Sequence, residues 1–165
     1  MFTYGRFNPP HLGHKMMIEE MMKLNKKVVV VVSHSQDKKK NPLSVTDKIR
    51  ILKTWFPKLD VRASSKNMSI AKIAENFSED SVMVVGEDRA KAFNFIPVQK
   101  RAVTRPPNAP SATRARNAAR AGNIATFRNL TGYNNKEILS KIRGSPNKKK
   151  NGSPKVSTRR SVRRV

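Results

Sequence analysis

The sequence contains no cysteine. It therefore has neither a disulfide framework nor a thiolate metal site, and this absence favours an intracellular location, cytoplasmic or nuclear. Long hydrophobic runs are missing too, since none approaches the roughly 18 apolar residues that a membrane span needs. No stretch has the pattern of a signal peptide. We therefore expect no membrane as a partner.

Acidic residues are scarce, with 11 Asp and Glu against 35 Lys and Arg and a formal net charge of +24. Such an imbalance favours polyanionic partners, namely nucleic acid, nucleotides or an acidic surface, and does not bear on the fold. Residues 144–165 hold eight of the basic residues, no acidic residue and no periodic apolar pattern. The sequence therefore predicts a domain at 1–143 and a disordered, basic, low-complexity tail at 144–165.

Within the predicted domain, short apolar runs alternate with amphipathic segments. The clearest run is Val28–Val32, five consecutive valines, which is typical of a strand covered on both faces. The pattern predicts strands at 2–4, 28–32, 59–63, 81–85 and 98–104, and helices at 14–25, 46–56, 69–77, 111–121, 124–130 and 135–143. This order predicts an α/β fold, a Rossmann-like doubly wound parallel sheet of about five strands with C-terminal helices.

The most informative stretch is close to the N-terminus and reads Gly5-Arg-Phe-Asn-Pro-Pro-His-Leu-Gly-His14. A turn rich in glycine and proline leads into a helix that would begin next to His11 and His14. The free N–H groups and the dipole of a helix N-terminus favour an anion, and two imidazoles add donors there. We expect Gly13 to allow the backbone to approach a ligand closely.

Two other interpretations of the histidine pair remain open, a metal site and two surface residues. A zinc site needs further ligands at plausible spacing. His34 is the only other histidine and no cysteine is present, so zinc is disfavoured and no protein metal ligand is predicted.

A second candidate anion site is Ser111-Ala-Thr113-Arg-Ala-Arg116. Ser111 or Thr113 can cap the helix predicted at 111–121, and their hydroxyl and N–H groups can hold phosphate oxygens. Arg116 follows Thr113 by three positions, so both can face one ligand. An ordinary capped and solvated basic helix would give the same pattern.

Together the two segments resemble the cytidylyltransferase-like nucleotidyltransferases. The first motif of that family, G-x-F-x-P-x-H-x-G-H, is complete at 5–14, and the second, S-x-T-x-x-R, matches 111–116. The resemblance covers roughly residues 2–143. The chain looks most like the small nucleotidyltransferases of phages and large viruses, which are described as nicotinamide-nucleotide adenylyltransferase-like or cytidylyltransferase-like.

The resemblance implies transfer of AMP or CMP from an NTP to a phosphorylated small-molecule acceptor, with Mg²⁺ entering with the NTP and pyrophosphate leaving. It implies catalytic roles for His11, His14 and Arg116 at the triphosphate. It further implies a set of nucleotide-binding residues, which are Gly5, Arg6, Phe7, Asn8, Gly13, Gly86, Asp88, Ser111 and Thr113.

A second hypothesis comes from another functional class. The charge is compatible with a basic nucleic-acid-binding or virion-associated protein on the same fold, with weak or no catalysis. Ser145-Pro146 and Ser153-Pro154, each followed closely by lysine, resemble DNA-contacting histone tails and proline-directed phosphorylation sites. The tail is equally compatible with a nuclear-targeting or solubility segment.

Overall fold

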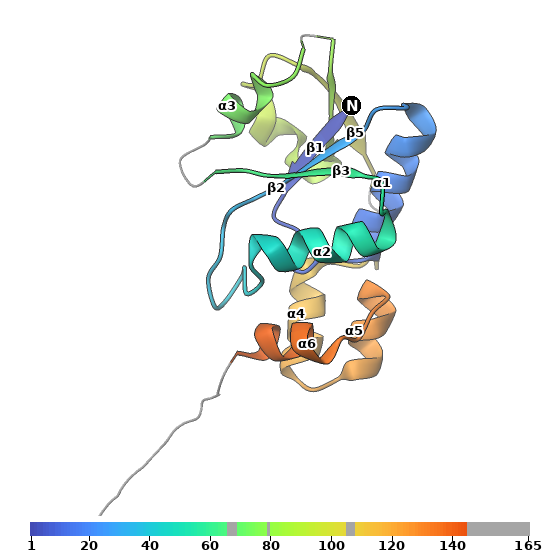
Figure 1. The fold of residues 1–165 in the computed structure, drawn as a ribbon, viewed down its shortest axis with the longest axis vertical. Coiled ribbons are helices and arrows are strands. Elements are labelled where there is room, and N and C mark those ends of the chain that lie inside the picture. Colours follow the sequence, from blue (N-terminus) through green and yellow to red (C-terminus); the bar gives the residue numbers. More distant parts are fainter. Residues whose placement is uncertain (66–68, 79, 105–107, 145–165) are drawn as a thin grey trace, which may run out of the picture.

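The computed structural model describes residues 1–65, 69–78, 80–104 and 108–144 (Figure 1). Of the tail predicted at 144–165, all residues after Gly144 lie outside this part of the chain. The elements follow in the order β1 (Phe2–Gly5), α1 (Leu12–Leu24), β2 (Val29–Val32), α2 (Val45–Trp55), β3 (Asp60–Ala63), α3 (Ile70–Ala74), β4 (Val82–Gly86), the 3₁₀ helix η1 (Glu87–Phe93), β5 (Gln99–Val103), α4 (Ala112–Arg120), α5 (Ile124–Thr131) and α6 (Lys136–Arg143).

The five strands form one parallel sheet in the order β3-β2-β1-β4-β5. The chain runs from β1 outward to one edge through β2 and β3, then returns to β4 on the other side of β1. The strand order therefore reverses between β1 and β4, and open α/β sheets bind ligands outside the carboxyl ends of the strands at such a point. The predicted α/β, Rossmann-like class is confirmed.

The alternation of side chains along β2 supplies both faces of the sheet. Val30 and Val32 pack with Ile18 of α1 and Leu52 of α2, whereas Val29 and Val31 pack on the opposite side. That opposite cluster includes Ile73 of α3 and Phe93 of η1. Helices thus cover both faces, which explains why all four valines of β2 are buried.

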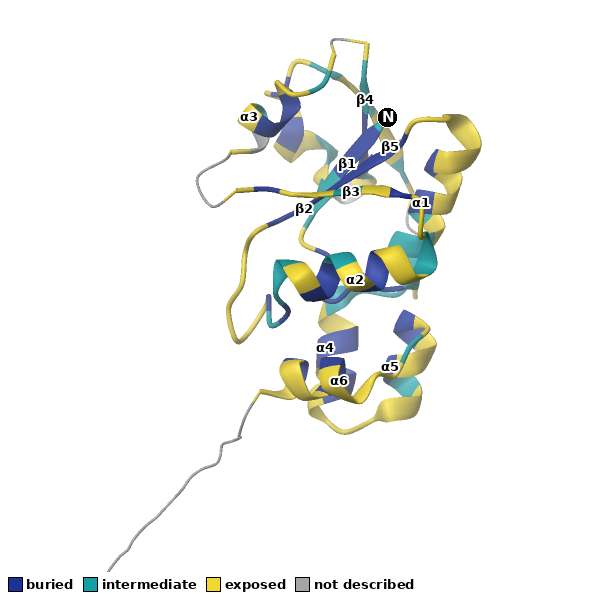
Figure 2. Cartoon of the chain, in the orientation of Figure 1, coloured by how far each residue is buried: buried dark blue, intermediate teal, exposed yellow. Residues whose placement is uncertain are grey.

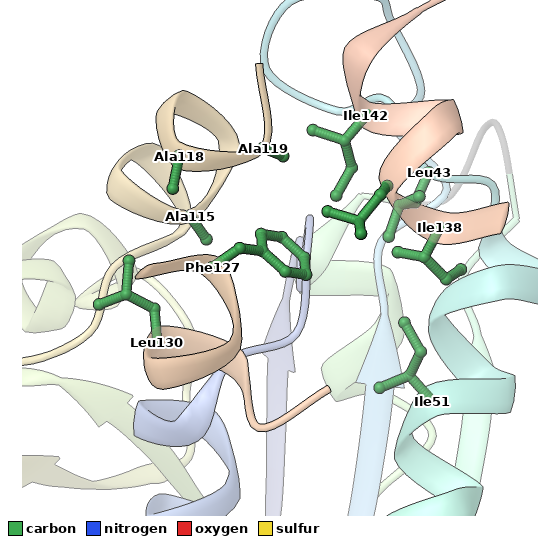
Figure 3. Close-up of a cluster of buried hydrophobic side chains, with 10 residues drawn as sticks. Leu43, Ile51, Ala115, Ala118, Ala119, Phe127, Leu130, Ile138 and Ile142 are labelled. Carbon is green, nitrogen blue, oxygen red and sulfur yellow. The ribbon is translucent and has the colours of Figure 1, made fainter. Parts of the chain in front are cut away.

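The three C-terminal helices form a smaller packed unit beside α2 (Figures 1 and 3). Its core contains Ala115 and Ala119 of α4, Phe127 of α5 and Ile142 of α6, and Ile51 of α2 joins it. Each helix buries one side and exposes the other (Figure 2). The C-terminal helical unit therefore packs against α2, the helix that follows β2, and lies close to the N-terminal motif.

Three local predictions need correction. The first helix begins at Leu12 rather than at 14, because the His11 side chain already caps it. Helix α3 ends at Ala74 rather than 77, because the chain turns at Glu75 and Asn76. No helix was predicted between the strands at 81–85 and 98–104, whereas Glu87–Phe93 form the 3₁₀ helix η1. Within the described residues, no helix is both long and apolar enough to cross a membrane.

Candidate functional site

A cavity of about 730 Å³ opens at the carboxyl ends of β1 and β4, where the strand order reverses. One part of its wall is polar or cationic and comes from Arg6, His11, His14, Ser33, Ser35 and Arg89. Another part is apolar and comes from Met16, Met17, Val85, Phe93 and Val103. The cavity therefore combines an anion-attracting end with a hydrophobic wall, as small-molecule sites commonly do.

His11 and His14 stand at the start of α1 and hold one another in place. The Nδ1 atom of His11 accepts the Gly13 N–H at 3.0 Å, and the Nδ1 atom of His14 accepts the His11 N–H at 3.1 Å. The two rings stack with their centroids 3.8 Å apart. Because both Nδ1 atoms are acceptors, a neutral imidazole at either position carries its hydrogen on Nε2. The donor atom of each ring is thus fixed by the backbone.

Gly13 has a structural role that the sequence did not suggest. A Cβ atom at this position would lie 2.8 Å from Cε1 and 2.9 Å from Nδ1 of His11. The glycine therefore makes room for the His11 ring, and the close approach of a ligand at this position stays a prediction. Gly5 is similar, since an added Cβ would lie 3.1 Å from the ring of Phe7. Phe7 is buried and has a φ of 48°. Its ring packs against the ring of His14, with the two centroids 4.5 Å apart.

The turn between β1 and α1 is held by three side chains from distant parts of the chain. Lys48 of α2 donates to the Arg6 carbonyl at 2.8 Å, and Arg116 of α4 donates to the Asn8 carbonyl at 2.9 Å. Tyr133, after α5, donates to the Pro10 carbonyl at 2.6 Å. We call this set, Lys48, Arg116 and Tyr133, the carbonyl clamp. It fixes every second carbonyl along residues 6–10.

The Asn8 side chain adds a fourth attachment. Its amide donates to the Leu43 carbonyl at 3.0 Å and accepts the Leu43 N–H at 2.8 Å. Asn8 is buried and does not line the cavity. Asn8 therefore joins the turn between β1 and α1 to Leu43, in the segment before α2.

Lys48 is the functional candidate that the sequence analysis missed. Its side chain is fully buried, and its ammonium group donates to the carbonyls of Arg6 and Ser33, both at 2.8 Å. Burial, together with a smaller effect of the positive charge of Arg6, lowers the pKa of Lys48 to about 8. One signal was available, because Lys48 precedes the apolar residues Ile51 and Leu52 by three and four positions and so shares their helix face.

The second predicted anion site, at the start of α4, is occupied by contacts within the protein. Ser111 caps the helix by accepting the Arg114 N–H at 3.1 Å. Arg116 contacts the Thr113 hydroxyl at 3.3 Å besides the Asn8 carbonyl. Burial lowers the pKa of Arg116, and the positive charge of Arg120 adds a smaller effect in the same direction. Ala109 and Pro110, just before these residues, line the cavity, whereas Ser111, Thr113 and Arg116 do not.

A family model described as cytidylyltransferase-like matches residues 2–100. The chain belongs to this family. The match contains the whole first motif and Lys48, and it ends before Ser111. Membership supports nucleotidyltransferase activity.

One solved structure similar to this cytidylyltransferase-like chain is that of a bifunctional NMN adenylyltransferase/ADP ribose pyrophosphatase from Francisella tularensis, complexed with AMP and an Mn ion. The TM-score is 0.60 at 17% identity, and the match covers 89% of this chain and 53% of that one. The chain thus spans about half the length of this relative, and at such identity the likeness shows the fold. A comparison with curated proteins gave no match.

Seven of the predicted site residues line the cavity of this cytidylyltransferase-like chain: Gly5, Arg6, Phe7, His11, Gly13, His14 and Gly86. Asn8, Ser111, Thr113 and Arg116 lie behind the lining, in contacts that shape it. The side chain of Asp88 is outside the described part of the structure. Arg89, whose guanidinium lies 5.4 Å from the Phe93 ring, lines the cavity and was not predicted.

A hard divalent metal ion in this cavity would need oxygen ligands from the cavity wall or from a bound molecule. Within the described residues, no three His, Asp or Glu side chains gather into a potential metal cage. Of the carboxylates described there, only Glu20 is part of the cavity wall. Mg²⁺ is commonly held by one or two carboxylates together with substrate phosphates. The residues present are thus compatible with Mg²⁺ that is held mainly by the phosphates of a bound triphosphate.

Proposed function

We propose that this protein transfers a nucleoside monophosphate, AMP or CMP, from an NTP to a phosphorylated small-molecule acceptor and releases pyrophosphate. The observation that carries this proposal is the histidine pair, whose Nδ1 atoms are tied to the backbone and whose rings line the cavity beside Arg6. Such donors suit a triphosphate, because they need no rearrangement when charge develops on its oxygens. Membership of the cytidylyltransferase-like family supports the same chemistry.

In the proposed reaction, an oxygen of the acceptor phosphate attacks the α-phosphorus of the NTP in line. A new P–O bond forms as the bond to the bridging oxygen of pyrophosphate breaks, and pyrophosphate leaves with that electron pair. The acceptor phosphate is already ionised, so no protein base is required. His11 and His14 would donate through Nε2 to the triphosphate oxygens, and Arg6 would add positive charge. Bound Mg²⁺ would supply charge neutralisation on the phosphates.

The apolar wall of the cavity is the proposed place for the nucleoside. Met16 and Met17 of α1 and Phe93 of η1 offer flexible and aromatic surface, which suits the faces of a base. Gly86, at the end of β4, lines the cavity as well and would border the ribose.

Pyrophosphate release over a panel of substrates tests the proposal. Each of ATP, CTP, GTP and UTP is combined, with Mg²⁺, with nicotinamide mononucleotide, phosphopantetheine, phosphocholine or glycerol phosphate. Nicotinamide mononucleotide comes first, because the solved relative is described as an NMN adenylyltransferase. We expect release with one NTP and one acceptor together, and none with either alone. Absence of release from every pair would overturn the enzyme proposal.

A second candidate function, nucleic-acid binding, is favoured by the surface of the C-terminal helices. A separate cavity of about 560 Å³ is lined by Arg120, Lys136 and Arg143 and by no acidic residue. With the net charge of +24, this surface is suited to phosphates of a nucleic-acid backbone. In the full chain, Lys136→Gln with Arg143→Gln should weaken duplex DNA binding and reduce the slope of log affinity against log salt by about 2. An unchanged slope would refute a role for this surface.

A further inference from the structure

Lys48 lies directly beneath the candidate triphosphate site. Its ammonium group bonds to the carbonyls of Arg6 and Ser33, and both of these residues line the cavity. Arg6 follows β1 and Ser33 follows β2, so one buried nitrogen joins the ends of two neighbouring strands. Ser33 also donates its N–H to the Gly5 carbonyl at 2.8 Å, which extends the same connection. The position of the ammonium group therefore sets the shape of the cavity floor.

Within the described residues, no carboxylate forms a hydrogen bond or an ion pair with Lys48. Its described hydrogen bonds go to neutral carbonyls. The adjacent Asp47 turns its carboxylate toward Lys141 at 2.9 Å and toward the Ser44 hydroxyl at 2.9 Å. A buried charge without a counterion is costly, and the cost falls when an anion binds close by.

The other charged or titratable groups described on the segments around the cavity floor are mainly arginines and histidines, and Glu20 is the described carboxylate of the cavity wall. Arg6, on the turn after β1, opposes the ammonium charge. Arg116 of α4 is bonded to the Asn8 carbonyl on the same turn. His11 and His14 line the cavity at the start of α1, and the exposed His34 follows Ser33. A negative ligand in the cavity would thus be the missing partner of the Lys48 charge.

We propose that Lys48 is a positioning residue whose buried ammonium holds the Arg6 and Ser33 carbonyls under the cavity, and that binding of a nucleoside triphosphate draws a proton onto this group. The inference rests on the proposed function of the cavity. In the free protein, burial and Arg6 lower the pKa of Lys48 to about 8, so the group is partly neutral in mildly alkaline solution. A bound triphosphate raises that pKa, because an opposite charge favours the charged form.

The rise in the pKa of Lys48 on binding gives the direction in which pH changes the affinity for the triphosphate. Below about pH 7 the ammonium is charged with or without ligand, so binding takes up no proton at this site. Near pH 8 the free protein holds roughly half a proton there and the complex a full one, so binding takes up about half a proton per site. Affinity for the triphosphate should therefore decline as pH rises above 8.

Isothermal titration calorimetry in buffers of different ionisation enthalpy measures this uptake directly. The full chain is titrated with Mg²⁺-ATP and with Mg²⁺-CTP at pH 6.8 and pH 8.0, and with adenosine and cytidine as ligands without phosphate. We expect roughly half a proton to be taken up per bound triphosphate at pH 8.0, little at pH 6.8, and none with the nucleosides. This experiment needs no variant.

Lys48→Arg is the matched variant, because a guanidinium keeps the charge and does not titrate in this range. It should bind the triphosphate without proton uptake and without the decline above pH 8. Lys48→Met, with a similar stem and no charge, should bind about 10- to 100-fold more weakly at both pH values. Thermal unfolding of each variant shows whether it is folded.

The outcomes separate the two proposals. If the wild-type chain binds a triphosphate at pH 8.0 without proton uptake, the Lys48 proposal is wrong and the nucleotide site remains. Equal uptake by wild type and Lys48→Arg would also overturn it. If neither triphosphate binds, the proposed function fails, and the Lys48 proposal fails with it.

Discussion

Tyr133 and Pro10, which are 123 positions apart, are joined by a hydrogen bond of 2.6 Å from the phenolic hydroxyl to the backbone carbonyl. Burial raises the pKa of Tyr133, so this hydroxyl remains a donor at neutral pH. The ring is held between Phe127 and Trp55, with centroids 5.6 Å and 6.1 Å away. The small C-terminal helical unit therefore reaches back to the turn that carries His11.

Tyr133→Phe tests this connection. The ring and its packing stay, and only the hydrogen bond to Pro10 is lost. We expect the free energy of unfolding to fall by about 1–2 kcal/mol, because a partly buried carbonyl loses its donor. Nucleotide affinity should fall as well, since the turn must then be ordered by the ligand. Denaturant unfolding and NTP titration measure the two effects, and a variant that matches wild type in both would show that the bond has no role.

Gly13→Ala sets two physical effects against each other. In an ordinary helix this change stabilises by about 0.5–1 kcal/mol, because alanine restricts the unfolded chain. Here the new methyl group would lie 2.8 Å from Cε1 of His11 and displace the ring. We expect net destabilisation of about 1–3 kcal/mol and loss of triphosphate binding. A variant that is more stable than wild type and still binds would contradict the role assigned to Gly13.

Lys141→Met tests the attachment of α6 to α2. Burial alone would raise the pKa of Asp47, but hydrogen bonds from Lys141 and Ser44 outweigh it and leave the pKa lowered. A carboxylate with a lowered folded-state pKa contributes stability above its unfolded pKa, and this stability is lost as pH falls through the folded pKa. The variant should therefore lose about 2 kcal/mol at pH 7 and progressively less below about pH 4.

The same helix offers a control for that measurement. Lys136 is exposed on α6, and Lys136→Met should change the free energy of unfolding by less than about 0.5 kcal/mol. Thermal or denaturant unfolding of both variants from pH 3 to pH 7 gives the comparison. A Lys141→Met loss that does not depend on pH would refute the ion-pair explanation.

The sequence predicted the sheet because its signals are local. Five consecutive valines fit only a strand covered on both faces, and the spacing of Gly5, His11 and Gly13 marked the turn before α1. A cap at Ser111 or Thr113 was also predicted, and Ser111 is the one that forms it, since capping depends on residues three apart. Each of these features is decided within a few positions of the chain.

The carbonyl clamp could not be predicted in the same way. Lys48, Arg116 and Tyr133 act on carbonyls 42, 108 and 123 positions away, and nothing local to these side chains specifies such partners. The motif interpretation expected Arg116 and Thr113 to face one ligand, which stays a prediction, and it did not foresee that they contact each other. The role of Gly13 was missed for a related reason, since it depends on where the His11 ring lies.

In the proposed reaction His14 acts through Nε2, while its Nδ1 caps the helix. His14→Asn separates these roles, because the asparagine Oδ1 can replace Nδ1 as the acceptor of the His11 N–H, and nothing replaces Nε2. The control is His34→Asn, an exposed histidine near the same end of the sheet that does not line the cavity.

The decisive measurement is the rate of pyrophosphate release by these two variants with the productive NTP and acceptor. We predict that His14→Asn stays folded and loses about 10²- to 10³-fold in rate, as when one preorganised donor to a developing charge is removed. His34→Asn should retain the wild-type rate. A folded His14→Asn that releases pyrophosphate as fast as wild type would contradict the account.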